Sequence, residues 1–280
     1  MELLRFMLLP MIACLFLAGI HGYLGIHVVS RGVIFVDLAM AQVAALGAAV
    51  GLIFHYELSS PVAYAFSIAF TLIGAGILSV THFRDHRVPH EAIIGVVYAV
   101  SAAAVILVMD HAPHGSEHIK ELLVGHILWV SKKEVIGEAI VYGLVGLVFA
   151  FLAPRIHLIS MDHEAAMNQG RRIYLWDFLF YALFGIVVTV SVRLAGVLLV
   201  FAFLVVPAII AFMFWNCFKH RIIAAWAVGA AVSIVGCVVS FEADLPTGAT
   251  VVVTFGVTLI IAGIIYRLFK YKPYQDEVCD

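Results

Sequence analysis

The chain has 280 residues, of which 64% are hydrophobic and only 12% are charged, and its formal net charge is −2. Soluble domains average about 45 to 50% apolar and about 25% charged residues. This chain has too few polar side chains to cover a water-soluble globule. The composition therefore excludes a soluble domain and predicts a polytopic membrane protein, for which no nucleic-acid partner is expected.

About 20 mainly apolar residues cross the hydrocarbon core of a bilayer as one helix. Nine stretches satisfy this condition, so we expect an all-α bundle of eight or nine transmembrane helices. The expected helices cover residues 5–28, 33–54, 61–80, 91–109, 135–154, 176–193, 196–215, 222–241 and 248–268. The count is eight if residues 193–196 form a bend. The polar stretches 110–134 and 154–175 are too short for a soluble domain, so residues 1–280 should form a single transmembrane domain.

The basic residues indicate how these helices are oriented, because cytoplasmic loops carry an excess of Lys and Arg. If nine helices alternate, five basic stretches fall on one side; they contain Arg31, Arg84/Arg87, Arg155/Arg171/Arg172, Lys219/Arg221 and Arg267/Lys270/Lys272. Lys132 and Lys133 fall on the opposite side and are the exception. The distribution predicts a multi-pass protein with its N-terminus outside and its C-terminus in the cytoplasm.

Several catalytic motifs are missing from the sequence. It has no G-x-x-x-x-G-K-[ST] P-loop, so the chain is not expected to bind ATP itself. The stretches "HEAII" at His90 and "HEAAM" at His163 each lack the second His of a zincin helix. There is no G-x-S-x-G motif and no C-x-x-C pair. These absences argue against an enzyme and against a bound cofactor.

Two polar residues lie in the apolar stretch "FVDLAMAQVAALGAAVG" (Phe35–Gly51), namely Asp37 and Gln42. A carboxylate inside a bilayer costs roughly 2.5 to 3.5 kcal/mol on insertion scales, and such residues mark transport paths. Asp37 could face such a path, or it could pair with Arg31 in the interface. Gln42 lies deeper, where an amide can also bridge two helices.

Histidines supply further candidate ligands, because neutral imidazole binds zinc, nickel and iron. His21 and His27 lie in the first expected helix, where a hydrogen-bonded core role is the alternative. The outer loop holds a cluster made of Asp110, His111, His114, Glu117 and His118, with His126 beyond it. This loop could gather a borderline cation, or it could be a solvated surface that receives a binding protein.

Four stretches share their pattern and their order with one transporter family. They are "LVGHILWVS" (Leu123–Ser131), "SMDHEAAMNQG" (Ser160–Gly170), "SVRLAGVLLVFAFLVVPAIIA" (Ser191–Ala211) and "DLPTGATVVV" (Asp244–Val253). They resemble the membrane permease subunits of bacterial ABC importers for zinc, manganese and related metal ions. In this resemblance His126 takes the place of a family Asn.

The resemblance implies a permease of the bacterial inner membrane that pairs with a second copy of itself. A separate ATPase subunit would bind ATP, and an extracellular or periplasmic solute-binding protein would deliver a divalent metal ion as substrate. Zinc and manganese are the first candidates for this ion and iron is the next. The segment at about 160–170 would dock onto the ATPase through Ser160, Asp162, His163, Glu164, Ala165 and Gly170, and the binding protein or metal would meet His111, His114, His118 and Asp244 outside.

The second helix departs from the family pattern of an Asp followed four residues later by a His on the same face. With Gly47 as anchor, Leu38 takes the Asp place and Gln42 the His place, while Asp37 is one residue early. Asp37 and Gln42 are then about 140° apart around the helix axis. The candidate metal residues are Asp37, Gln42, His21, His27 and His126. Because the metal pair is altered, a chelated metal or another small solute remains an alternative cargo. An ion-gradient-driven secondary transporter, which would need no ATPase, is a separate alternative.

Overall fold

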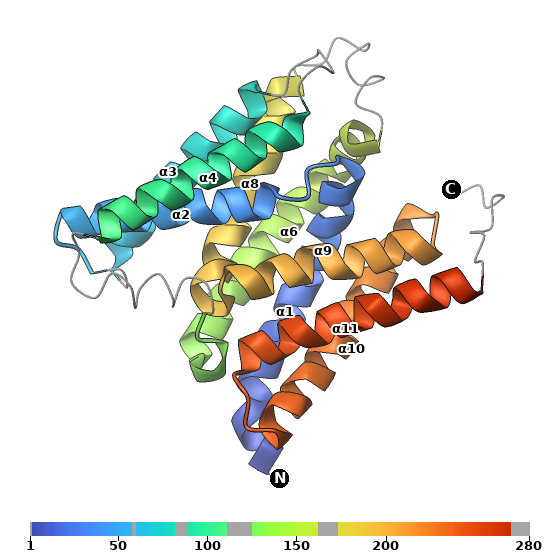
Figure 1. The fold of residues 1–280 in the computed structure, drawn as a ribbon. Helices are drawn as coiled ribbons and strands as arrows, with labels where there is room; N and C mark the ends of the chain where they lie inside the picture. Colours follow the sequence, from blue (N-terminus) through green and yellow to red (C-terminus); the bar gives the residue numbers. More distant parts are fainter. Residues whose placement is uncertain (1, 58–59, 82–88, 111–124, 162–172, 270–280) are drawn as a thin grey trace. The chain divides into compact units, whose positions relative to one another are not determined.

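The computed structural model describes residues 2–57, 60–81, 89–110, 125–161 and 173–269, and every regular element in these ranges is a helix (Figure 1). The long helices are α1 (Glu2–Ser30), α2 (Val36–Ile53), α3 (Pro61–Val80), α4 (His90–Met109), α6 (Lys132–Met161), α8 (Ile173–Ala195), α9 (Val197–Phe214), α10 (Phe218–Glu242) and α11 (Thr247–Leu268), and η1 (Ile127–Trp129) is a short 3-10 helix. Nine helices in the described ranges are long and apolar enough to span a membrane. The predicted all-α transmembrane fold is therefore confirmed.

Residues 193–196, where a bend would have reduced the helix count to eight, contain a break of one residue between two spanning helices. α8 ends at Ala195, α9 begins at Val197, and Gly196 between them has φ +78° and ψ 158°. This backbone conformation is open almost only to glycine. Both flanking helices reach spanning length, so the described part of the chain favours nine helices over eight.

Helix α6 differs from its prediction at both ends. It runs from Lys132 to Met161, whereas residues 135–154 were expected. Ser160, the first of the predicted docking residues, is consequently the penultimate residue of α6. The remaining predicted docking residues, 162–170, lie outside the described residues.

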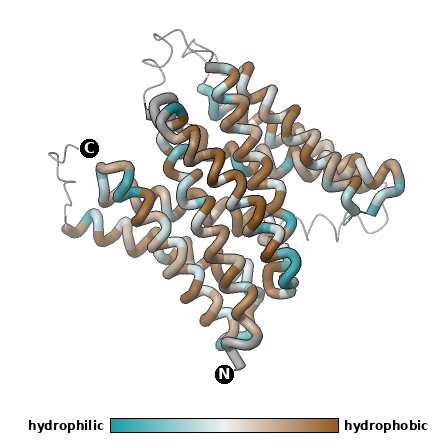
Figure 2. The backbone as a smooth tube through the Cα atoms, turned by 180° about the vertical axis from the view of Figure 1, so that it is seen from behind, coloured by the Kyte–Doolittle hydropathy of each residue, from teal (hydrophilic) through white to brown (hydrophobic). Residues whose placement is uncertain are grey.

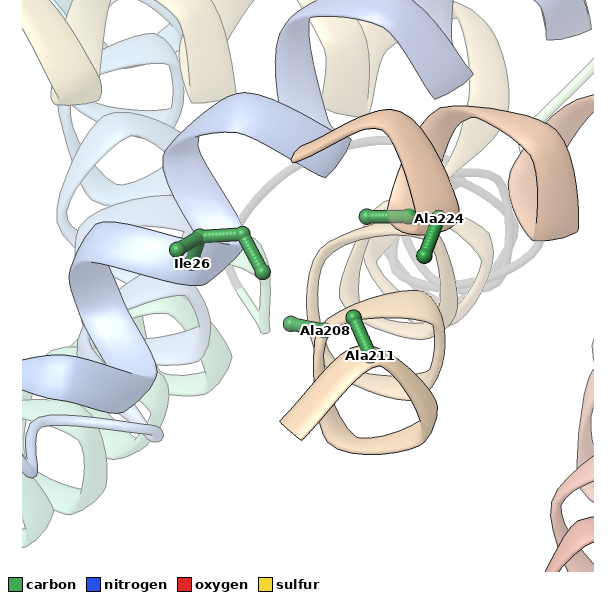
Figure 3. Close-up of a cluster of buried hydrophobic side chains, with 5 residues drawn as sticks. Ile26, Ala208, Ala211 and Ala224 are labelled. Carbon is green, nitrogen blue, oxygen red and sulfur yellow. The ribbon is translucent and has the colours of Figure 1, made fainter. Parts of the chain in front are cut away.

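The helices divide into two compact units. The first comprises Met1–Val29, Val124–Tyr142 and Leu194–Asp280, and so contains most of α1, the start of α6, and α9, α10 and α11. Small residues bring these helices together: a Cβ on Gly25 of α1 would collide with the backbone carbonyl of Leu204 in α9. Figure 3 shows a buried cluster in which Ile26 of α1 meets Ala208 and Ala211 of α9 and Ala224 of α10.

The second unit comprises Ser30–Leu123 and Gly143–Arg193, and contains α2, α3, α4, the rest of α6 and most of α8. Gly47 of α2 packs against the backbone of α3 at Phe66. Thr71 of α3 and Thr189 of α8 share a hydrogen bond of 2.9 Å between their hydroxyl oxygens. Close backbone approach and hydroxyl bonds drive helix association in lipid, where no hydrophobic effect operates between helices.

Hydrophobic residues run along the helices, and hydrophilic residues concentrate mainly near the helix ends (Figure 2). Large apolar side chains such as Leu107, Phe151 and Ile260 are exposed rather than buried. A water-soluble protein rarely exposes so much apolar surface, whereas a bilayer accepts it. The few ionisable side chains that are buried therefore stand out as candidates for function.

Candidate functional site

Asp37 lies in the first turn of α2 and is completely buried. Neither of its carboxylate oxygens has a hydrogen-bond partner among the residues that the structure describes. Its place near the N-terminus of α2 is favourable for a negative charge, because the helix dipole is positive there. A buried carboxylate with no protein partner is nevertheless costly, and a cation that bound to it would offset this cost.

Arg31 does not supply that cation. One guanidinium nitrogen of Arg31, Nη1, donates to Oδ1 of Asp177 in α8 over 2.8 Å, and the two side chains are 6% and 0% exposed. The guanidinium also stacks on the Phe180 ring, with Cζ 4.0 Å from the ring centroid. The alternative in which Asp37 merely pairs with Arg31 is therefore wrong.

Helix α4 fixes the start of α2. The backbone N–H of Phe35, the residue before α2, donates to Oε1 of Glu91 over 2.8 Å. The neighbouring His90 Nε2 lies 3.3 Å from the Tyr181 hydroxyl oxygen of α8. The first turn of α2, which carries Asp37, is thus tied to α4 by a hydrogen bond, and the start of α4 is tied to α8.

Gln42 does not join Asp37 in a site. It is half-buried, five residues further along the regular helix α2, whereas Asp37 is fully buried. Five residues of regular helix separate two side chains by about 140°. The predicted angular separation of Asp37 and Gln42 is therefore retained.

His21 and His27 lie on α1 in the first unit and have different surroundings. His21 is buried, its Nδ1 lies 3.1 Å from the Leu17 carbonyl oxygen, and its Nε2 has no partner within the described ranges. The ring of His21 meets the edge of Tyr142, with centroids 6.1 Å apart. His27 is buried between the rings of Tyr23 and Phe218, so the two histidines do not form one site.

The sequence analysis missed two buried carboxylates, Glu138 and Asp177. Glu138 of α6 is 1% exposed, and its Oε1 accepts a hydrogen bond of 2.5 Å from the Tyr142 hydroxyl. Its Oε2 has no partner in the described part of the chain. Both residues carried the same signal as Asp37, because each is an acid inside an expected transmembrane helix.

The predicted outer residues are described only in part. The backbone N–H of His126 donates to the Leu194 carbonyl oxygen over 3.1 Å, and its Nε2 lies 3.6 Å from Oε1 of Glu134. Asp244 is exposed, with φ +52°, in the turn between α10 and α11. The other predicted contacts lie outside the described residues, namely His111, His114 and His118 in the outer loop and Asp162, His163, Glu164, Ala165 and Gly170 in the docking segment.

No group of three His, Cys, Asp or Glu side chains that could hold a metal ion occurs among the residues that the structure covers. The candidate ligands instead form separate environments. Asp37 lies in the second unit, and His21 lies in the first unit beside Tyr142, whose hydroxyl donates to Glu138. Each places a buried polar atom without a protein partner in an otherwise apolar helix. Such atoms suit transient contact with a polar or charged solute better than permanent coordination.

Known proteins with a similar sequence and fold are membrane transport components. The chain is 25% identical over 267 residues to a Haemophilus influenzae protein named "Probable iron transport system membrane protein", covering 93% of this chain and 90% of that one. It is 22% identical to the Streptococcus gordonii "Manganese import system permease protein ScaB", covering 93% and 91%. The solved structure "PsaBC from Streptococcus pneumoniae in complex with Fab" has the same fold, with a TM-score of 0.78 at 21% identity over 96% of this chain and 98% of that one.

These relatives match nearly the whole length of the chain, and the described ranges of the chain contain nine helices that could span a membrane. Together they indicate a multi-pass protein of the bacterial inner membrane that serves as the permease component of a transporter. The ABC 3 transport family matches residues 4–266, and the chain therefore belongs to this family of ABC transporter permeases.

Proposed function

We propose that this protein is the permease of an ABC importer that carries a divalent transition-metal ion into the cell, and that Asp37 contacts the ion on its path. Zinc and manganese are the first candidates for the ion and iron is the next. Relatives named for iron and for manganese transport support a metal cargo. The observation that carries the role of Asp37 is its fully buried carboxylate without a protein partner in the described ranges.

The physical problem for such a permease is the charge of its cargo. A bare divalent ion in hydrocarbon is prohibitively unfavourable, so oxygen and imidazole groups must replace its water. They must also bind weakly enough to release the ion on the other side. Isolated groups such as Asp37 and His21 fit this requirement better than a complete metal cage. Gln42, His27 and His126 are further candidate contacts.

We infer that three partners complete the transporter. The chain has no P-loop, so a separate ATPase subunit would bind and hydrolyse ATP. The segment 160–170 would dock onto this subunit, and a second permease copy would form the other half of the path. A solute-binding protein would deliver the ion to the outer surface, where His111, His114, His118 and Asp244 are candidate contacts.

The test of this proposal is uptake of radioactive Zn²⁺ and Mn²⁺ by cells that express the complete transporter. Asp37→Asn keeps the size of the side chain and removes its charge, and it should lower uptake of the transported ion at least about tenfold. Glu57→Gln removes an exposed acid and serves as the matched control. Normal uptake by Asp37→Asn, with equal amounts of protein in the membrane, would reduce Asp37 to a structural role.

A second candidate cargo is a chelated metal, because α2 has Leu38 and Gln42 where the family pattern has its metal pair. An amide binds polar organic groups readily and metal ions poorly. Uptake of the free ion and of its complex with a chelator, measured side by side, separates the two cargoes. Uptake that persists without any ATPase subunit would instead identify a gradient-driven transporter.

A further inference from the structure

Helices α1 and α10 pack closely against each other inside the first unit. The Trp226 indole N–H of α10 donates to the Gly19 carbonyl oxygen of α1 over 2.7 Å. A Cβ added to Gly22 would lie 2.9 Å from Cδ1 of the same Trp226. One turn earlier on α1, the Ala18 Cβ would lie 3.0 Å from a Cβ added to Gly229. The contacts move backward along α1 as they move forward along α10, so the two helices are antiparallel.

Two cysteine thiols, which have no part in the proposed function, meet further along this interface. Cys14 of α1 and Cys237 of α10 are both completely buried, and neither is in a disulfide. Their side chains share a hydrogen bond. Cys14 lies about one turn before Ala18, and Cys237 lies about two turns after Gly229. Because each Cβ is inclined toward the N-terminus of its own helix, the two side chains of these antiparallel helices lean toward each other and close the remaining offset.

This thiol pair suits a bond between its own two sulfurs better than a bound metal ion. The Glu138 carboxyl of α6 acts electrostatically on Cys14, and it accepts a hydrogen bond from the Tyr142 hydroxyl. A closed zinc site takes four ligands. Among the residues that the structure describes, no three His, Cys, Asp or Glu side chains gather closely enough to hold a metal ion.

The position of the thiol pair also favours a disulfide. A disulfide requires two cysteines whose backbones are close and whose side chains point at each other. The small residues Ala18, Gly22 and Gly229 allow the close approach of the two helices at the neighbouring turns. The distribution of basic residues predicts that α1 begins outside and α10 ends outside, so Cys14 and Cys237 lie in the outer halves of their helices. This is the side of the membrane on which disulfides form and persist.

We propose that Cys14 and Cys237 are a modification site at which hydrogen peroxide forms a reversible disulfide that links α1 to α10. The thiolate of one cysteine attacks a peroxide oxygen; an S–O bond forms, the O–O bond breaks, and the released hydroxide takes up the proton of that thiol to leave as water. The other thiol then attacks the sulfenic sulfur; the S–S bond forms, and the hydroxyl group leaves with the second proton as water. The two cysteines lose two electrons, and one peroxide molecule is reduced to two water molecules.

The test treats membranes that contain the complete transporter with hydrogen peroxide, then denatures the protein and alkylates its remaining thiols with iodoacetamide. Mass spectrometry of the digested protein measures the alkylated fraction of each cysteine and detects peptides that are joined by a disulfide. In the wild type we expect alkylation of Cys14 and Cys237 to be lost together and a peptide pair joined through these two residues to appear. Dithiothreitol added before alkylation should restore both. Cys14→Ser and Cys237→Ser are the matched controls, and neither should give a joined peptide pair that contains its remaining thiol.

Two results would overturn the inference. One is that Cys14 and Cys237 of the wild type remain fully alkylated under conditions in which glutathione in the same sample is oxidised. The other is that either residue is joined to a different cysteine. The wild-type measurement is decisive even if a serine variant does not reach the membrane, because it needs no substitution. The inference does not depend on the cargo or on Asp37, so uptake by Asp37→Asn tests the proposed function separately.

Discussion

Replacement of Gly25 by Ala tests whether close contact between α1 and α9 stabilises the first unit. An added Cβ would collide with the Leu204 carbonyl oxygen and would lie 3.1 Å from the Leu204 carbonyl carbon and 3.2 Å from the Ala208 Cβ. A backbone carbonyl cannot rotate away, so the two helices must separate. Overpacking of this kind costs about 1 to 3 kcal/mol. We expect Gly25→Ala to lower the thermal unfolding temperature of the purified protein in detergent by several degrees.

Gly19→Ala is the matched control because it lies on the same helix with nothing within 4 Å of its added Cβ. Alanine favours a helix over glycine by about 0.8 to 1.0 kcal/mol, so this variant should be equally or more stable than the wild type. Both variants gain the same helix propensity, so they should differ by the overpacking cost alone, about 1 to 3 kcal/mol. If Gly25→Ala unfolds at the same temperature as Gly19→Ala, the close contact between α1 and α9 does not stabilise the unit.

Two further predictions concern hydrogen bonds to buried or partly buried carboxyl groups. Tyr142→Phe removes the only hydrogen bond to the Glu138 carboxyl in the described ranges, and it should destabilise the protein by about 1.5 to 3 kcal/mol. Thermal unfolding measures this loss, and Tyr98→Phe, which removes an exposed hydroxyl, is the control. Glu91→Ala removes the acceptor for the Phe35 N–H and should cost about 1 kcal/mol. It should also lower metal uptake, because the first turn of α2 loses its anchor; unchanged uptake would show that this anchor does not position Asp37.

The transmembrane helices could be predicted well from the sequence because each is a long apolar run bounded by polar residues. α3 matches its predicted range of residues 61–80 at both ends, where Ser60 caps the helix and Pro61 occupies its first position. The start of α6 was predicted three residues late, since Lys132 is charged. The stretch "SKKE" nevertheless contained the signal: the Ser131 hydroxyl accepts the Glu134 N–H and the Glu134 carboxylate accepts the Ser131 N–H, which is a capping box.

The partners of the buried charges could not be predicted in the same way. Arg31 and Asp177 are 146 residues apart in the sequence, and only the tertiary fold brings them together. Sequence proximity suggested Asp37 as one possible partner of Arg31, but Arg31 pairs with Asp177 instead. Periodicity shows which residues share a helix face, but a single sequence contains no information on which faces of distant helices meet.

The three fully or almost fully buried carboxylates of the described ranges now differ in a way that the sequence concealed. Asp177 is neutralised by Arg31, and Glu138 accepts a short hydrogen bond from Tyr142. Asp37 alone has two oxygens without a protein partner in those ranges. A structural role explains a carboxylate that has a partner, because the pair stabilises the contact between helices. It does not explain an unpaired buried one, which is unfavourable unless a cation or a proton neutralises it, so Asp37 is the residue on which the transport proposal depends.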